Sequence, residues 1–144
     1  MKKMRPKKSA RKSSLGPKRL LAIRTVMMPR DTNPLGSIFG GHILSLIDFA
    51  AGQHARMASP RNKPPQSYVT KVMREVNFIA PVFVGDAVSF YTKTIKVGRT
   101  SIAIRVDVEA QRGLDLLKVI PVTSAEVVMV AVDKNTKPVP IFKK

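Results

Sequence analysis

The chain has 144 residues, 26 Lys and Arg against 9 Asp and Glu, a formal net charge of +17, and no cysteine. This length fits one domain with a substantial hydrophobic core, while the lack of cysteine excludes a disulfide framework and a thiolate metal site. No apolar stretch approaches the roughly 20 residues of a membrane span, and the N-terminus lacks the apolar segment of a secretory signal, so we expect a soluble, cytoplasmic protein.

Positive charge is concentrated at the N-terminus. Nine of the basic residues lie among the first 20, and the first acidic residue is Asp31. We expect residues 1–19 to form a solvated, disordered tail, and residues 20–144 to form the folded domain. Such a tail can bind nucleic acid or anionic lipid loosely, or can keep the protein soluble, and we expect no specific nucleic-acid partner.

Apolar patterning predicts a strand, a long helix and four further strands, in that order. The first strand covers residues 20–28 and ends at Pro29, and turn-forming residues place a loop at 31–36. The helix covers residues 41–58 and is closed by Ser59 and Pro60.

The four later strands are predicted from apolar runs and from alternation. Gly98 and Arg99 form a candidate two-residue hairpin, and the strand at 102–109 alternates between a buried and a wet face. The other strands cover 68–79, 88–97 and 123–132, with a loop at 111–120 and with the last strand, apolar on both faces, near the sheet centre. A sheet of antiparallel strands curled around one long helix is an α+β arrangement.

The predicted helix is apolar on nearly every face, so we expect it to be wrapped by other elements. The one acid in this apolar run is Asp48, whose helical neighbours Ser45, Ala51 and Gly52 are small. A carboxylate in such a place needs a binding partner or a chemical function.

The start of the helix carries two glycines. Gly40 and Gly41 let a ligand approach the backbone closely, and free amides there, with the helix dipole, suit a carbonyl oxygen that gains negative charge. Gly41 and Asp48 are separated by about 10 Å along the helix axis. One helix cannot easily bring both groups to one reacting carbon, whereas two antiparallel copies can, which points to a site shared across a dimer.

Four segments carry a family resemblance: DTNPLGSIFGGHILSLID, VTKVMREVNFIAPVFVGDAVSFY, KVGRTSIAIRVDVEAQR and VTSAEVVMVAVD. Together they resemble the hotdog-fold acyl-CoA thioesterases, of the bacterial YciA type and its cytosolic acyl-CoA hydrolase relatives, over residues 20–141. The resemblance implies the hotdog fold, an antiparallel sheet wrapped around a central helix and paired as a dimer, often in hexamers that are trimers of dimers. It implies hydrolysis of acyl-CoA to a fatty or other carboxylic acid and coenzyme A, without a cofactor.

The resemblance also implies roles for individual residues. Asp48 would activate water, or attack the thioester directly to give an anhydride. Asn33 would hold the water or the thioester from the opposite subunit. Gly41, with Gly40, would donate backbone amides to the thioester oxygen, and Phe39 would pack at the mouth of the acyl channel.

A second motif would bind the other end of the substrate. Arg99, Thr100 and Ser101 match the family's turn that meets the coenzyme A phosphates, and an arginine fork suits phosphate oxygens. Lys71 and Arg74 depart from the commoner family pattern, so preference for acyl length cannot be transferred from relatives. Neither histidine has metal-ligand spacing with nearby acids, and no metal is predicted.

Two alternatives belong to other classes. A non-catalytic acyl-CoA or nucleic-acid binding module would depend on the basic tail, so removing residues 1–19 would abolish its function and Asp48→Asn would not. A hydroxyacyl dehydratase of the same fold would need a suitably placed histidine and acid, and the chain lacks that pattern.

Overall fold

A computed structural model describes residues 18–115 and 117–143. All of the predicted tail except Lys18 and Arg19 therefore lies outside the described residues. The elements are β1 (Leu20–Val26), the short 3-10 helix η1 (Pro29–Asp31), α1 (Gly40–Ala58), β2 (Ser67–Arg74), β3 (Ala87–Val97), β4 (Ser101–Gln111) and β5 (Val119–Val132). This order confirms the predicted strand, long helix and four strands.

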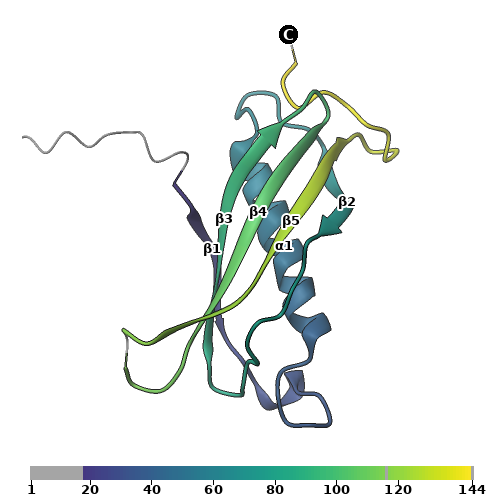
Figure 1. The fold of residues 1–144 in the computed structure, drawn as a ribbon. Coiled ribbons are helices and arrows are strands. Elements are labelled where there is room, and N and C mark those ends of the chain that lie inside the picture. Colours follow the sequence, from purple (N-terminus) through teal and green to yellow (C-terminus); the bar gives the residue numbers. More distant parts are fainter. Residues whose placement is uncertain (1–17, 116, 144) are drawn as a thin grey trace, which may run out of the picture.

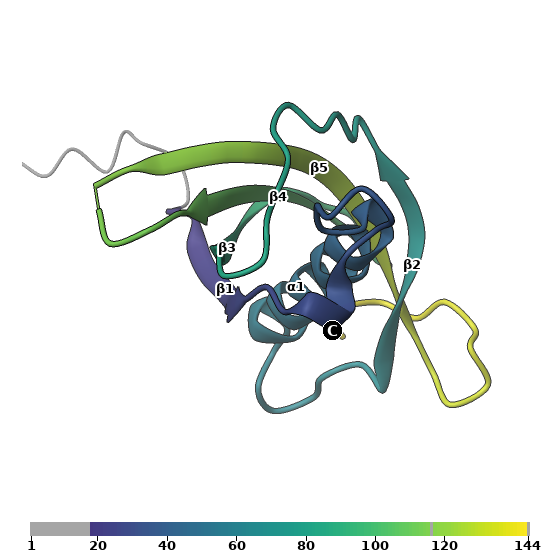
Figure 2. The same cartoon turned by 90° about the horizontal axis from the view of Figure 1, so that it is seen from below.

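The five strands form one antiparallel sheet in the order β1-β3-β4-β5-β2. The sheet curls around one side of α1, which lies along its concave face (Figures 1 and 2), and α1 contacts all five strands. The predicted α+β architecture, a curved sheet around one long helix, is thus confirmed. None of the helices in the described ranges has the length and hydropathy needed to cross a membrane.

Three details differ from the sequence prediction. β2 ends at Arg74 instead of continuing to residue 79, because Glu75 adopts a left-handed backbone conformation with φ 58°. The predicted loop at 111–120 is shorter, since β4 extends to Gln111 and β5 begins at Val119. The first strand ends at Val26 instead of continuing to residue 28. The last strand lies inside the sheet, between β4 and β2, as its two apolar faces predict.

The core lies between α1 and the concave face of the sheet. The helix contributes Ile43, Ile47, Ala50 and Ala51, all almost completely buried. The predicted wrapping of the helix is supplied on one side by the sheet, and Phe49 on the other side is 68% exposed in the single chain.

One polar group anchors the buried side of the helix. His54 is 6% exposed, and its Nδ1 and Nε2 atoms lie 2.9 and 2.7 Å from the hydroxyls of Thr92 and Thr94 on β3. Burial lowers the pKa of His54. The neutral ring donates through one nitrogen and accepts through the other, and each threonine hydroxyl can supply the matching partner.

Candidate active site

The start of α1 is fixed by the loop that precedes it. The Phe39 amide donates to the Asp31 carbonyl at 2.8 Å, and the Ile38 amide donates to the Val82 carbonyl at 2.7 Å. The amides of Gly40 and Gly41 belong to the first turn and have no intrahelical acceptor. The ring of Phe39 covers Gly41 so closely that a Cβ there would collide with it. Glycine is therefore required for this arrangement of ring and helix start.

Asn33 shapes the same loop. Its Oδ1 accepts from the amides of Leu35 and Ser37 at 2.9 and 3.2 Å, and its Nδ2 donates to the Ser37 hydroxyl at 2.8 Å. A primary amide has two N–H groups. Among the described residues, one N–H of Asn33 has no acceptor, while the rest of the side chain holds the turn.

Asp48 lies midway along α1, beside the edge strand β2, and is exposed. Oδ1 accepts a hydrogen bond from the hydroxyl of Thr70 on β2. None of the described cations forms an ion pair with this carboxylate. The group is oriented by one hydroxyl and remains accessible.

An open cavity of about 570 Å³ borders this carboxylate. Its lining comes from one side of α1 and from the two sheet strands nearest to it: Asp48, Phe49, Gly52, Gln53, Arg56, Tyr68, Val69, Thr70 and Met129. Sequence reasoning missed Thr70, because it lies 22 residues from Asp48 and only the packing of β2 beside α1 brings the two together.

A second, apolar pocket of about 360 Å³ lies at the start of the helix. It is lined by Ile38, Gly40, Ile43, Phe78, Ile79, Ala80, Pro81 and Val82. More than half of this wall belongs to the irregular segment between β2 and β3, part of which was predicted to be strand. No sequence signal identified Phe78, whose ring lies 3.8 Å from the position that a Cβ on Gly40 would take.

An ion pair between a buried carboxylate and a partly exposed guanidinium fixes that irregular segment. Asp86 is 1% exposed. Its two carboxylate oxygens accept hydrogen bonds from Nε and Nη2 of Arg112, at 3.0 and 2.8 Å. The Phe83 amide also donates to it, at 2.9 Å. Burial by itself raises the pKa of Asp86, but the hydrogen bonds from Arg112 and Phe83 and the Arg112 charge outweigh it and lower the pKa.

The turn that carries Arg99 lies elsewhere. Gly98, Arg99 and Thr100 connect β3 to β4, one residue more than the predicted two-residue hairpin. Arg99 is exposed and belongs to none of the ion pairs among the described residues. In Figure 1 this turn and the start of α1 are at opposite ends of the molecule. One chain therefore does not bring Arg99 to Gly41.

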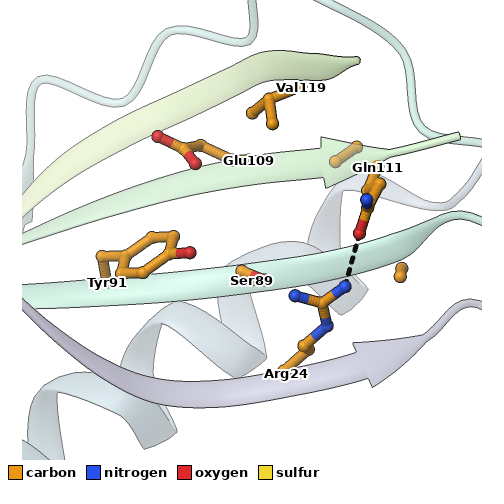
Figure 3. Close-up of a pocket in the computed structure, with 8 residues that line it drawn as sticks. Arg24, Ser89, Tyr91, Glu109, Gln111 and Val119 are labelled. Atoms are coloured by element: carbon orange, nitrogen blue, oxygen red, sulfur yellow. Dashed lines mark hydrogen bonds between the residues drawn. The ribbon is translucent and has the colours of Figure 1, made fainter. Parts of the chain in front are cut away.

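A third pocket, of about 350 Å³, lies on the face of the sheet turned away from α1 (Figure 3). Arg24 donates to Gln111 across it, and Tyr91 and Glu109 line it. Arg19 was predicted to belong to the tail. Its guanidinium donates a hydrogen bond to the Glu109 carboxylate at 2.8 Å and stacks on the Tyr91 ring, 4.0 Å from the ring centre. This pocket is separate from the predicted site, with the sheet between them.

No group of three or more metal-ligating side chains that could hold a metal ion occurs in residues 18–115 and 117–143. The two cavities beside α1 are bordered by the Asp48 carboxylate, by a few polar side chains including Arg56, by the glycine at the helix start and by apolar side chains. Such a set can activate water and polarise a carbonyl group.

Comparison with known proteins places this architecture in a family. The model of the Thioesterase superfamily matches residues 35–116. The acyl-CoA thioester hydrolase YciA of Salmonella typhimurium is 34% identical over 123 residues, which are 84% of this chain and 89% of the relative. An uncharacterized acyl-CoA thioester hydrolase of Haemophilus influenzae is 38% identical over 120 residues, 82% of this chain and 75% of the relative.

Solved structures give the same result. A hexameric broad-specificity acyl-coenzyme A thioesterase superposes with a TM-score of 0.79 at 36% identity, covering 88% of this chain and 89% of the other. A hexameric hotdog-fold thioesterase of Campylobacter jejuni superposes with a TM-score of 0.75 at 46% identity. The match covers 85% of this chain and 90% of the other. The chain belongs to the hotdog-fold thioesterase superfamily and, within it, to the acyl-CoA thioester hydrolases, which confirms the resemblance drawn from its sequence.

Proposed function

We propose that this protein hydrolyses acyl-CoA thioesters to a carboxylic acid and coenzyme A, with Asp48 as the group that activates water. The observation that carries the proposal is the position of Asp48. Its carboxylate borders an open cavity, is oriented by the Thr70 hydroxyl and has no cationic partner among the described side chains. The names of the relatives supply the substrate class.

The proposed reaction needs little from the protein, because resonance stabilises a thioester carbonyl less than that of an ester or amide. A water molecule attacks the carbonyl carbon while Asp48 accepts its proton. The amides of Gly40 and Gly41 stabilise the oxygen that becomes negative. The carbon–sulfur bond then breaks, and the sulfur of coenzyme A leaves with a proton. Direct attack by Asp48 through an anhydride would use the same residues, and neither route requires a cofactor.

We propose that each site is shared between two antiparallel copies of α1. Seven residues are about two helical turns, so Gly41 and Asp48 face the same side of the helix about 10 Å apart. Ser45 and Gly52 on that side are small, which permits close approach, and the exposed Phe49 beside them would be covered. In such a pair, Gly41 of one copy would lie near Asp48 of the other.

The remaining predicted residues fit this arrangement. The one unused N–H of Asn33 would contact the water or thioester bound at the partner's Asp48, and Phe39 would border the entrance to the acyl pocket at Gly40. Arg99, Thr100 and Ser101 would bind the coenzyme A phosphates. Since several similar structures are hexameric thioesterases, we propose a trimer of such dimers. A cytoplasmic location stays a prediction.

The test is release of free thiol from a panel of acyl-CoA thioesters of increasing chain length. Wild type is compared with Asp48→Asn, with Asp115→Asn as a matched acid-to-amide control in an exposed loop, and with a variant lacking residues 1–17. We expect turnover that collapses only in Asp48→Asn. If no chain length is hydrolysed and the N-terminal segment alone binds polyanions, the protein is the binding module instead.

The shared site has its own test. Asp48→Asn and Gly41→Val, in which the new side chain displaces Phe39 over the helix start, are each expected to be nearly inactive. A mixed dimer of the two keeps one intact site, so refolding them together at equal amounts should restore about a quarter of wild-type activity. A mixture no more active than its components would place each site within one chain.

A further inference from the structure

The last residues of the chain fold back onto the turn between β3 and β4. We call residues 137–143 the C-terminal strap. After β5 the chain reverses, with the Asp133 amide bonded to the Lys137 carbonyl at 2.9 Å. The strap then runs beside the end of β5, where the Val139 amide donates to the Ala131 carbonyl at 2.9 Å. Figure 1 shows it beside the β3–β4 turn.

The strap is bonded to the turn that carries Arg99. The Ile141 amide donates to the Arg99 carbonyl at 2.9 Å, and the Ile141 side chain is 2% exposed within the core. The next two carbonyls of the turn are also occupied, that of Thr100 by the Ala131 amide and that of Ser101 by the Gly98 amide. The backbone of the turn is therefore fixed, while the Arg99 side chain extends into solvent.

The strap brings two more exposed side chains to this corner. Because Ile141 is buried and its amide is bonded to Arg99, the residues that follow must emerge next to the turn. Phe142 is 56% exposed, and Lys143 is exposed as well. The one acid between residues 133 and 143 is Asp133, and it accepts from the amides of Asn135 and Lys137. The corner thus joins an open aromatic ring with two cations.

An aromatic ring beside cations has the chemistry that a nucleotide needs. Purine bases stack on exposed aromatic side chains, and arginine and lysine bind phosphate oxygens. We propose that the turn and the strap together form the subsite for the nucleotide half of coenzyme A. Phe142 stacks on the adenine ring, Arg99 and Lys143 bind phosphate oxygens, and Ile141 is a positioning residue that holds the turn.

This inference rests on the proposed function, because that function supplies coenzyme A as the ligand, and it adds the strap to the binding residues. It also separates the roles of the two ends of the substrate. The reacting thioester lies at α1, and the nucleotide is held at the corner where β3, β4 and the strap meet. Removal of the nucleotide should therefore weaken binding without changing the chemistry.

The experiment compares two substrates with the same acyl group, an acyl-CoA and the acyl thioester of pantetheine, which lacks the nucleotide. For Phe142→Ala we expect KM for acyl-CoA to rise about tenfold, as the loss of one stacked base implies. Its kcat, and both parameters for the pantetheine thioester, should stay unchanged. Phe142→Trp should restore KM, and Leu117→Ala, at a 93% exposed loop residue, is the matched control.

The cationic and positioning residues are tested in the same assay. Arg99→Ala and Lys143→Ala should raise KM for acyl-CoA alone, with an effect that shrinks as salt is added. Ile141→Ala should also raise KM for acyl-CoA alone, because the turn is then held less firmly. In Ile141→Val, KM for acyl-CoA should stay close to the wild-type value.

The outcomes separate this inference from the proposed function. Equal changes on both substrates in Phe142→Ala, or equal KM values of wild type for both thioesters, would overturn the subsite and leave hydrolysis intact. If neither thioester were hydrolysed, the proposed function would fail. Calorimetric binding of coenzyme A to wild type and Phe142→Ala would then decide the subsite, and equal affinities would overturn it.

Discussion

Two aspartates of this protein have opposite surroundings. Asp86 is 1% exposed and accepts hydrogen bonds from the Arg112 guanidinium and the Phe83 amide. Asp48 is exposed and receives one described hydrogen bond, from Thr70. The buried acid has its charge and its lone pairs satisfied by the protein, whereas the exposed acid has an oxygen left for a ligand.

The difference shows how a fold treats an acid that builds structure and one that is available for chemistry. A buried carboxylate without partners is costly, so Asp86 must be paired, and its pairing fixes the wall of the apolar pocket. A fully paired Asp48 could not accept a proton from water. Substitutions at the two positions should therefore have opposite consequences for stability and for activity.

The largest effect is expected for Asp48→Asn. Loss of a general base should lower kcat by a factor of about 10² to 10⁴ in the thiol-release assay. The thermal midpoint should stay close to that of wild type, because asparagine has the same shape as aspartate and its Oδ1 can still accept from Thr70. Retention of half the wild-type kcat would remove Asp48 from the mechanism.

Arg112→Met should give the reverse result, a large loss of stability. It leaves Asp86 buried without its cation, which typically costs about 3–5 kcal/mol, measurable by urea unfolding. The double variant Asp86→Asn with Arg112→Met should recover part of this loss, because no charge is then stranded. A double variant as unstable as the single one would show that Arg112 acts through its packing on Phe83.

The same pair sets the behaviour of the wild type in acid. Because the folded state lowers the pKa of Asp86, the pair stabilises the protein fully above the unfolded pKa, near 3.8. That stabilisation is lost as the pH falls from there through the folded pKa. The acid-induced loss should be smaller in the double variant.

The sequence was sufficient for the features that depend on local pattern. The long helix, the order of strands and the unusual place of Asp48 all follow from residues close together in the chain. The contact of Thr70 with Asp48, the Phe78 wall and the pairing of Asp86 with Arg112 depend on packing between distant segments. No periodicity or spacing encodes those contacts.

The exposed side of α1 in the single chain could not be predicted from the apolar pattern either. Apolar residues on nearly every face of the helix predicted a wrapped helix, and the sheet of one chain supplies that cover on one side while Phe49 on the other side is exposed. Apolar periodicity records that a side is covered but not whether the cover belongs to the same chain. The roles of Asp48, Asn33 and Gly41 stay predictions, since they concern a ligand and a second copy.

A smaller effect on activity is expected for Thr70→Val, which keeps the shape of the side chain but removes the hydroxyl bonded to Asp48. A hydrogen bond to a charged group contributes about 1.5–3 kcal/mol, so kcat should fall by about 10- to 100-fold, with KM little changed. Thr70→Ser should keep most of the activity. Equal losses in the valine and serine variants would mean that β2 packing matters and the hydroxyl does not.

The smallest effect should come from His54, the polar group on the buried side of the same helix. Burial lowers its pKa from the ordinary value of 6.5, so the unfolded chain takes up a proton more readily than the folded one. Stability is therefore complete above about pH 6.5 and falls as the pH drops below it. The thermal midpoint should be lower at pH 5 than at pH 7.5. The difference should shrink in His54→Gln, whose amide can still donate and accept between Thr92 and Thr94. An unchanged difference would show that His54 does not cause the pH dependence, because the stabilisation by the Asp86 pair is still complete at pH 5.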